Sequence, residues 1–232
     1  MVSLGCAKNL VDSEIMLGSL KRAGYEISPL ADEAEVIIIN TCGFIGPAKQ
    51  ESIETILEMA GYKEVGRCQA LIVTGCLSQR YGQKLMEEMP EIDGMLGTGE
   101  LDRLPEILWA VSQGRRPIAV GKPGFHYDDE MPRQVTTAPH SVYLKIAEGC
   151  SHTCAYCVIP AIRGPYRSRS MASILREARE LVGQGARELV LIAQDTSAYG
   201  KDLPGSPELP ELLRELSKLP EVQWLRVLYT YP

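Results

Sequence analysis

Membrane spans and export signals are missing from this sequence. None of its hydrophobic runs approaches the roughly 20 residues that a membrane-spanning helix needs. Residues 1–6 contain no basic stretch followed by a longer apolar stretch, so we expect no signal peptide. The sequence also has no short-period repeat and no low-complexity tract. These absences favour a cytoplasmic globular protein without a membrane partner.

An excess of positive charge is missing as well. The 232 residues include 24 Lys and Arg against 30 Asp and Glu, a formal net charge of -6. A broad nucleic-acid-binding surface is normally basic, so this balance makes RNA an unexpected partner. It would suit a basic protein partner, although mild acidity can also serve only to keep a protein soluble. A chain of this length can bury a core without disulfides.

The cysteines do not form an evident disulfide framework, because their number is odd and no secretion signal accompanies them. In a reducing compartment thiols stay reduced, so clustered cysteines indicate a metal site or catalysis. The three histidines, His126, His140 and His152, have no spacing that suggests a site. Candidate ligands are therefore sought among the seven cysteines, which are Cys6, Cys42, Cys68, Cys76, Cys150, Cys154 and Cys157.

Short apolar runs alternate with helical patterns in the first part of the chain. Residues 36–39 are apolar and β-branched, as expected of a strand covered on both faces. Ile53, Ile56, Leu57 and Ala60 have the spacing of one helix face. The alternation predicts an open, largely parallel α/β sheet. Its strands are expected at residues 2–4, 25–30, 36–39, 70–73 and 94–96.

Residues 112–140 are rich in Gly and Pro and lack sustained periodicity, so we interpret them as a linker between an N-terminal domain, 1–111, and a C-terminal domain, 141–232. The linker could include one short strand at 118–120. Three further strands are predicted at 142–146, 189–193 and 223–228. Three strand–helix units cannot close a barrel, which suggests a fragment.

The strongest motif is the CxxxCxxC run formed by Cys150, Cys154 and Cys157. It follows the first predicted strand of the second segment. Three thiolates within eight residues can hold one face of an iron–sulfur cluster and leave one iron open to a ligand. Structural zinc is the alternative, but zinc normally takes four ligands, and the nearest fourth one here is His152.

A second set of cysteines is scattered in sequence but shares one structural position. Cys6, Cys42 and Cys76 each follow the carboxyl end of an apolar run. Since those ends meet at one edge of a parallel sheet, the topology predicts a second three-thiolate site. The alternative is three unrelated core or loop thiols. Cys68 precedes its strand and is interpreted as a structural or surface thiol.

Together these residues resemble the radical S-adenosylmethionine enzymes, and among them the methylthiotransferases. The resemblance extends over nearly the whole chain. Its motifs are Ser3–Glu14, Asn40–Ile45, Thr74–Cys76, Glu148–Cys157, Ile159-Pro160, Arg163-Gly164, Gln194–Gly200 and Leu228–Pro232. The implied fold is α/β, an N-terminal open parallel α/β domain followed by the first part of a radical-SAM partial (β/α) barrel. Within that family this chain would be a C-terminally truncated fragment.

The resemblance implies two 4Fe-4S clusters and S-adenosyl-L-methionine as cofactors. Cys150, Cys154 and Cys157 would hold the cluster that cleaves S-adenosylmethionine. Cys6, Cys42 and Cys76 would hold an auxiliary cluster that presents the sulfur for insertion. The resulting radical removes hydrogen from an unactivated C–H bond, so no catalytic side chain is expected beyond the cluster ligands.

Two branches of the family differ in substrate. Residues Gly5–Val11, Cys42–Ile45 and Gln194–Ser197 are similar to the RimO type, which modifies the β-carbon of an aspartate in a small-subunit ribosomal protein, protein twelve. The MiaB type modifies a transfer-RNA adenosine and is the alternative. An electron donor such as flavodoxin or ferredoxin is an implied partner. A non-catalytic, metal-stabilised binding module is a third hypothesis.

Several other residues have both a functional and an ordinary interpretation. The resemblance places Tyr156 near the adenine of the cofactor and Gln194 and Asp195 near its methionine end, where an amide and a carboxylate suit an ammonium group. Asp195 could equally cap a turn. A solvated surface run is the favoured interpretation for Arg163, Arg167 and Arg169. Asp12 and Glu14 are interpreted as acids favoured early in a helix.

Overall fold

The structure is a computed structural model that describes residues 1–124, 127 and 131–231. His126 and Pro232 therefore lie outside the described residues, as do residues 125 and 128–130 of the expected linker. The chain divides into two compact units, each described here by itself. The first comprises Met1–Phe125 and Ala161–Arg163, and the second comprises His126–Pro160 and Gly164–Pro232. Among the described residues, no helix has both the length and the apolar character needed to cross a membrane.

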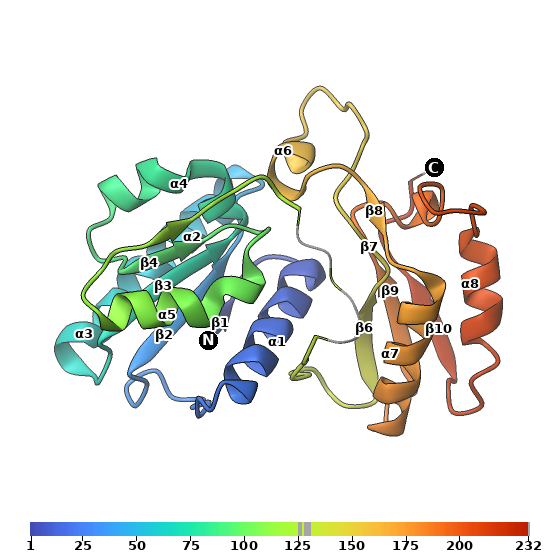
Figure 1. Ribbon diagram of the computed structural model, residues 1–232, viewed down its shortest axis with the longest axis horizontal. Helices are drawn as coiled ribbons and strands as arrows, with labels where there is room; N and C mark the ends of the chain where they lie inside the picture. The colour runs from blue at the N-terminus through green and yellow to red at the C-terminus, as the bar shows by residue number, and fades with distance from the viewer. Residues whose placement is uncertain (125–126, 128–130, 232) are drawn as a thin grey trace. The chain divides into compact units, whose positions relative to one another are not determined.

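The first unit is built on a fully parallel five-stranded sheet with helices on both faces (Figure 1). The order of the strands in the sheet follows their order in the chain, and the second and third strands are buried almost throughout. The strands are β1 (Val2–Ser3), β2 (Val36–Thr41), β3 (Ala70–Gly75), β4 (Gly94–Leu96) and β5 (Ile118–Ala119). The short strand considered within the expected linker thus pairs with β4 as an edge strand.

Side-chain alternation along the sheet sends successive residues to opposite faces. Ile37 and Ile39 of β2 pack in one cluster with α2 (Gly46–Ala60) and α4 (Cys76–Glu88). On the opposite face, Ile38 packs in a second cluster with residues of α1 (Ala7–Arg22), η1 (Leu101–Arg103) and α5 (Leu104–Ser112). A short helix, α3 (Tyr62–Val65), follows α2. The result is a three-layer α/β/α unit, as predicted.

The strand expected at residues 25–30 is wrong. That segment has no regular secondary structure, and Tyr25, Ile27 and Leu30 are 38–51% exposed. The chain leaves α1 through Gly24, whose φ of +89° turns it out of the helix. A period-2 apolar pattern marks a strand only where a neighbouring strand takes its hydrogen bonds, and none pairs with it in the described sheet.

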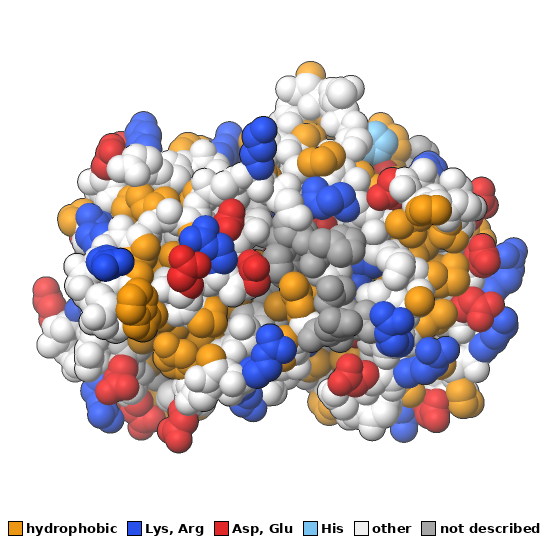
Figure 2. Space-filling view, viewed as in Figure 1, with side chains coloured by type: hydrophobic (Ala, Val, Ile, Leu, Met, Phe, Trp, Pro, Cys, Tyr) orange, Lys and Arg blue, Asp and Glu red, His pale blue; other side chains and the backbone are white. Residues whose placement is uncertain are grey.

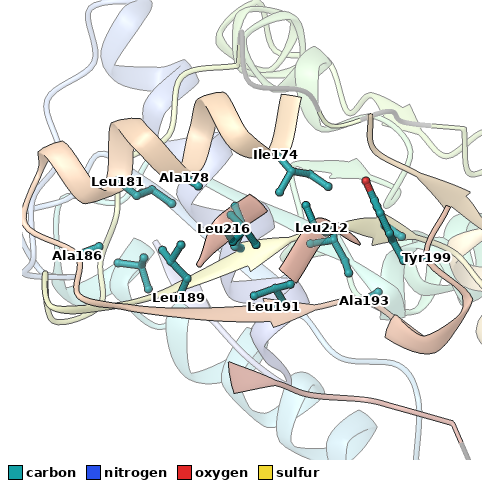
Figure 3. Packing of buried hydrophobic residues seen from close by; sticks show 14 residues of the cluster. Ile174, Ala178, Leu181, Ala186, Leu189, Leu191, Ala193, Tyr199, Leu212 and Leu216 are labelled. Atoms are coloured by element: carbon teal, nitrogen blue, oxygen red, sulfur yellow. The ribbon is translucent and has the colours of Figure 1, made fainter. Parts of the chain in front are cut away.

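The second unit contains a parallel three-stranded sheet in the order β10-β9-β6. These strands are β6 (Ser141–Lys145), β9 (Glu188–Ile192) and β10 (Trp224–Val227). The helices α7 (Met171–Gly183) and α8 (Leu209–Leu216) pack in one apolar cluster with the sheet. Figure 3 shows the α7 residues Ile174, Ala178 and Leu181 facing the β9 residues Leu189 and Leu191, with Leu212 and Leu216 of α8 in the same cluster.

Short elements at the carboxyl end of β6 were not predicted. An antiparallel pair, β7 (Ala147–Glu148) and β8 (Arg167–Ser168), encloses the CxxxCxxC loop and the helix α6 (Ile159–Arg163) in sequence. A 3-10 helix, η2 (Thr196–Ala198), follows β9. The strand–helix alternation otherwise agrees with the expected start of a partial β/α barrel, and it places the cysteine loop and residues 194–198 after the carboxyl ends of β6 and β9.

Candidate metal centres

The three scattered cysteines follow adjacent strands of the first sheet, as predicted. Ser3 of β1 pairs with Asn40 of β2, and Thr41 of β2 pairs with Gly75 of β3. Cys42 and Cys76 are therefore the next residues of two neighbouring strands, and Cys6 follows β1. Because parallel strands end at a common edge, the topology brings together three thiols from distant parts of the sequence.

Two glycines allow the cysteine-bearing segments to approach closely. Gly5 has a φ of +87°, and a Cβ on it would lie 2.8 Å from the Cβ of Cys42 and 3.1 Å from its Sγ. A Cβ on Gly43 would lie 2.7 Å from the carbonyl oxygen of Cys76. Larger residues at either position would separate the cysteines. The segments that bear Cys6, Cys42 and Cys76 are thus in direct contact.

Polar side chains hold this edge in place. The Asn9 amide nitrogen donates to the carbonyl oxygen of Leu4 at 3.0 Å and to that of Thr41 at 2.9 Å. These two bonds tie the chain entering Cys6 to the end of β2, directly before Cys42. The Ser52 hydroxyl accepts from the backbone N–H of Cys42 at 3.0 Å and donates to its carbonyl oxygen at 3.0 Å.

A buried arginine reaches the same edge. Arg163, in the short segment that belongs to the first unit, donates from Nη1 to Asp12 Oδ2 at 2.6 Å. Its Nη2 donates to Asn9 Oδ1 and lies 3.4 Å from the Sγ of Cys76. The side chains of Arg163 and Asp12 are each 3% exposed. The surface interpretation of Arg163 is therefore wrong, and Asp12 serves as a buried counter-charge.

The Cys76 thiol lies in an electrostatically mixed environment. Burial raises the pKa of the Cys76 thiol above its ordinary value, the Arg163 guanidinium partly offsets this, and the charges of Cys6 and Cys42 raise it further. Metal ligation deprotonates thiols, so three close thiols at one edge fit an iron–sulfur cluster.

Among the described residues, no three His, Cys, Asp or Glu side chains converge closely enough to hold one ion. A four-iron cluster differs because each thiolate binds a different iron, so its ligands stand further apart than those of zinc. None of the seven cysteines is in a disulfide. Cys68 is buried and donates to the carbonyl oxygen of Ala70, which agrees with its structural interpretation.

In the second unit, the CxxxCxxC motif forms a loop after β7. Cys150 is buried, whereas Cys154 and Cys157 are partly exposed. The Cys150 N–H donates to the carbonyl oxygen of Gly164, and the Cys157 N–H to that of Cys154, each at 3.0 Å. One backbone hydrogen bond thus fixes the start of the loop, and another closes a turn at its end. It presents three thiols from one short segment.

Gly149 makes the close approach at the start of the loop possible. Its φ is +78°, and a Cβ on it would lie 2.1 Å from the carbonyl oxygen of Pro165 and 2.6 Å from that of Gly164. Only glycine fits such a contact without displacing the backbone. The sequence motif therefore contains a packing requirement as well as ligands.

Gln194 lies beside a residue that the sequence interpretation did not single out. Its Nε2 donates to Glu148 Oε1 at 2.6 Å, and Lys145 Nζ donates to Glu148 Oε2 at 2.9 Å. The Oε1 of Gln194 is buried and has no hydrogen-bond partner in the described structure. A buried acceptor without a partner beside a carboxylate suits an ammonium donor. The sequence feature that could have indicated Glu148 is its position directly before Gly149 and Cys150, at the start of the cysteine motif.

Asp195 caps the turn that follows β9. Its Oδ1 accepts from the backbone N–H of Ser197 at 3.0 Å, which was the alternative interpretation of this residue. Its Oδ2 lies 2.7 Å from His152 Nε2, and the His152 ring stacks on Tyr231 with centroids 4.5 Å apart. Burial would raise the pKa of Asp195, but the hydrogen bonds from Ser197 and His152 outweigh it and lower that pKa. His152, whose spacing in the sequence suggests no site, thus contacts a residue that the resemblance places near the cofactor.

Three further side chains, Tyr156, Arg167 and Arg169, differ in how far the structure agrees with their expected positions. Tyr156 is 88% exposed and contacts no described core, so packing does not explain it. Arg169 is buried, donating to Glu177 Oε2 at 2.5 Å and to the carbonyl oxygen of Lys145 at 2.7 Å, so its surface interpretation is wrong. Arg167 is partly exposed and donates to the carbonyl oxygen of Pro165. Spacing alone could not distinguish these arginines, because burial depends on distant partners.

Comparison with known proteins agrees with this arrangement. Residues 1–97 match the uncharacterized protein family UPF0004, and residues 144–230 match the radical SAM superfamily. Among solved structures, the radical S-adenosylmethionine methyltransferase TsrM from Kitasatospora setae, with tryptophan substrate and a SAM analog bound, is similar at a TM-score of 0.59 and 17% identity. It matches 91% of this chain and 48% of its own, which supports the fold.

Curated relatives are much closer in sequence. Proteins named ribosomal protein uS12 methylthiotransferase RimO are 54% identical in Pelotomaculum thermopropionicum and 53% identical in Geobacter sulfurreducens, over 100% of this chain. The chain spans about half the length of these relatives, 52% in both. The expectation of a fragment agrees with this coverage. Over its whole length, the chain is therefore similar to methylthiotransferases of the RimO type, and its second part matches the radical SAM superfamily.

Proposed function

We propose that this chain is the cluster-binding part of an enzyme that transfers a methylthio group to the β-carbon of an aspartate in the small-subunit ribosomal protein uS12. The observation that carries the proposal is the pairing of two three-thiol arrangements in one chain. One is assembled by three parallel strands of the first unit, and the other by the CxxxCxxC loop of the second. The relatives at 53–54% identity are named ribosomal protein uS12 methylthiotransferase RimO, which supports the proposal.

The thiols of Cys6, Cys42 and Cys76 would hold one 4Fe-4S cluster, and those of Cys150, Cys154 and Cys157 would hold the other. When bound, the clusters and S-adenosyl-L-methionine would supply one-electron chemistry and the methylthio group, which no amino-acid side chain provides. The role of the protein would be to hold the clusters, to orient S-adenosylmethionine and to shield both from water. No acid or base besides the ligands is assigned a proton transfer.

Gln194 and Glu148 would orient S-adenosylmethionine. The partnerless Oε1 of Gln194 would accept a hydrogen bond from the ammonium of the methionine end, and the Glu148 carboxylate would balance its charge. Asp195 would act indirectly. Its carboxylate would hold His152 in place, and His152 is part of the cysteine loop. Tyr156 would cover the adenine with its exposed ring.

A basic ribosomal protein suits the acidic balance of this chain. Figure 2 shows Lys and Arg intermixed with Asp and Glu over the described part of the visible face, without a large region of positive charge. The proposed location is the cytoplasm, and a flavodoxin or ferredoxin is the proposed electron donor.

The first experiment measures iron and sulfide after anaerobic reconstitution. We expect about eight irons in the chain and about four in a Cys150→Ala/Cys154→Ala/Cys157→Ala variant, as two four-iron clusters require. A Cys6→Ala/Cys42→Ala/Cys76→Ala variant should also retain about four. Cys68→Ala is the matched control and should retain them all. Zinc without iron would contradict the proposal.

The substrate is tested separately. The chain is used within its full-length protein, with dithionite as reductant and either uS12 or transfer RNA as acceptor. The release of 5′-deoxyadenosine and the change in mass of the acceptor are measured. Modification of uS12 at an aspartate supports the proposal. Modification of transfer RNA alone would identify the adenosine-modifying branch instead.

A further inference from the structure

Arg163 places a buried guanidinium against a thiol of the first candidate site. Its Nη2 lies 3.4 Å from the Sγ of Cys76, and its side chain is 3% exposed. The residue reaches this site from a distant part of the sequence, in the short segment Ala161–Arg163 that belongs to the first unit.

The guanidinium is held in a fixed orientation. Nη1 donates to Asp12 Oδ2 at 2.6 Å, while Nη2 donates to Asn9 Oδ1. Asn9 is itself anchored to the backbone ahead of Cys6 and of Cys42 through its bonds to Leu4 and Thr41. Because a guanidinium is a planar fork, partners on both nitrogens leave it little freedom. Its position relative to Cys76 is therefore determined by the same contacts that fix the cysteine-bearing segments.

The charge at this place has a predictable effect on a metal cluster. A buried cation acts through a low effective dielectric and is weakly screened. Hydrogen bonds and positive charge near ligand sulfurs stabilise the more negative, reduced form of a cluster and raise its reduction potential. Asp12 opposes this effect, since it partly compensates the same guanidinium. The pair therefore provides two variants with opposite expected signs.

We propose that Arg163 is a positioning residue of the auxiliary cluster, which orients the Cys76 ligand and raises the reduction potential of that cluster through its charge. This inference rests on the proposed function, which supplies the cluster. Arg163 acts on the ligand and is not itself assigned contact with substrate.

The test isolates the auxiliary cluster in the full chain by replacing Cys150, Cys154 and Cys157 with alanine. Reduction potential is measured by a redox titration followed by electron paramagnetic resonance. Arg163→Gln should lower the potential, Asp12→Asn should raise it, and Arg163→Lys should retain most of the parent value. The apparent affinity for iron, measured by competition with a chelator, should fall about 10–100-fold in Arg163→Gln, the range typical for residues that support metal ligands.

Arg80→Gln is the matched control. Arg80 donates to the carbonyl oxygen of Gly43, beside Cys42, but it is exposed, so the same loss of charge is screened by solvent. Its potential should stay at the parent value. If Arg163→Gln does not assemble a cluster, Asp12→Asn and Arg163→Lys decide the inference.

Two outcomes separate this inference from the proposed function. A parent chain without an iron–sulfur cluster would overturn both. A parent chain with a cluster whose potential is unchanged in Arg163→Gln and Asp12→Asn would overturn the role of Arg163 alone and leave the proposed function intact.

Discussion

Gln194 donates a hydrogen bond to Glu148 across 2.6 Å, joining the end of β9 to the strand that enters the cysteine loop. The two residues are separated by 46 positions in sequence. Their contact forms a polar pair in which a carboxylate lies beside a buried, partnerless carbonyl oxygen. Such a pair is suited to an ammonium group, and it leads to the first prediction.

Replacing Glu148 with Gln should weaken binding of S-adenosylmethionine by about tenfold or more, because a hydrogen bond to a charged group contributes about 1.5–3 kcal/mol. Equilibrium dialysis with the reconstituted chain measures the affinity. Glu221→Gln removes the same charge at an exposed position of the second unit and should have no effect. Equal affinities in the parent chain and Glu148→Gln would exclude this residue from the cofactor site.

Gly149→Ala should destabilise the second unit and abolish cluster assembly in the CxxxCxxC loop. The added Cβ would lie 2.1 Å from the carbonyl oxygen of Pro165, at a φ of +78°. The backbone strain alone costs about 1–3 kcal/mol. Urea unfolding and iron content are the measurements. In Gly183→Ala, by contrast, the Cβ meets nothing within 4 Å at the end of α7, so no loss is expected.

Protonation of Glu177 in acid should make the second unit less stable. Burial alone would raise the pKa of Glu177, but Arg169, Arg133 and the hydrogen bond from Tyr127 outweigh it and lower that pKa below the ordinary 4.5. A lowered carboxyl pKa stabilises the fold above the unfolded-state value, and this contribution is lost as pH falls through the folded-state value. Stability should therefore decline below about pH 4.5.

The variant Glu177→Gln isolates this contribution. It leaves buried arginines without their counter-charge and should cost about 3–5 kcal/mol near neutral pH. In urea unfolding, its stability difference from the parent chain should shrink as the pH falls below about 4.5. A difference that is independent of pH would show that Glu177 contributes by packing alone.

Ile56 and Leu57 are adjacent on α2 but should respond differently to truncation. Both belong to the helical stripe seen in the sequence, yet Ile56 is 0% exposed and Leu57 is 50% exposed. Ile56→Ala should cost about 2–5 kcal/mol in the free energy of unfolding, as buried Ile→Ala changes do. Leu57→Ala should cost far less. Similar urea midpoints for the two variants would contradict the packing of this helix.

Local patterns in the sequence determined most element types and indicated the two sets of cysteines that we propose as cluster ligands. The β-branched run at residues 36–39 is a buried strand, and the alternation of strands and helices specified a parallel sheet. Cys150, Cys154 and Cys157 could be recognised as a set because three thiols in one short loop are constrained by chain connectivity. For Cys6, Cys42 and Cys76, the rule that parallel strands end at one edge was sufficient.

Only the tertiary structure decided which polar groups lie beside those cysteines and the residues near them. Arg163 and Asp12 are 151 residues apart, and their burial against each other leaves no trace in local spacing. The same holds for His152 with Asp195 and for Gln194 with Glu148. Residues 25–30 show the converse, because an alternating apolar pattern did not form a strand without a partner. Periodicity is a property of one segment, whereas charge compensation and strand pairing depend on groups that the fold brings from elsewhere.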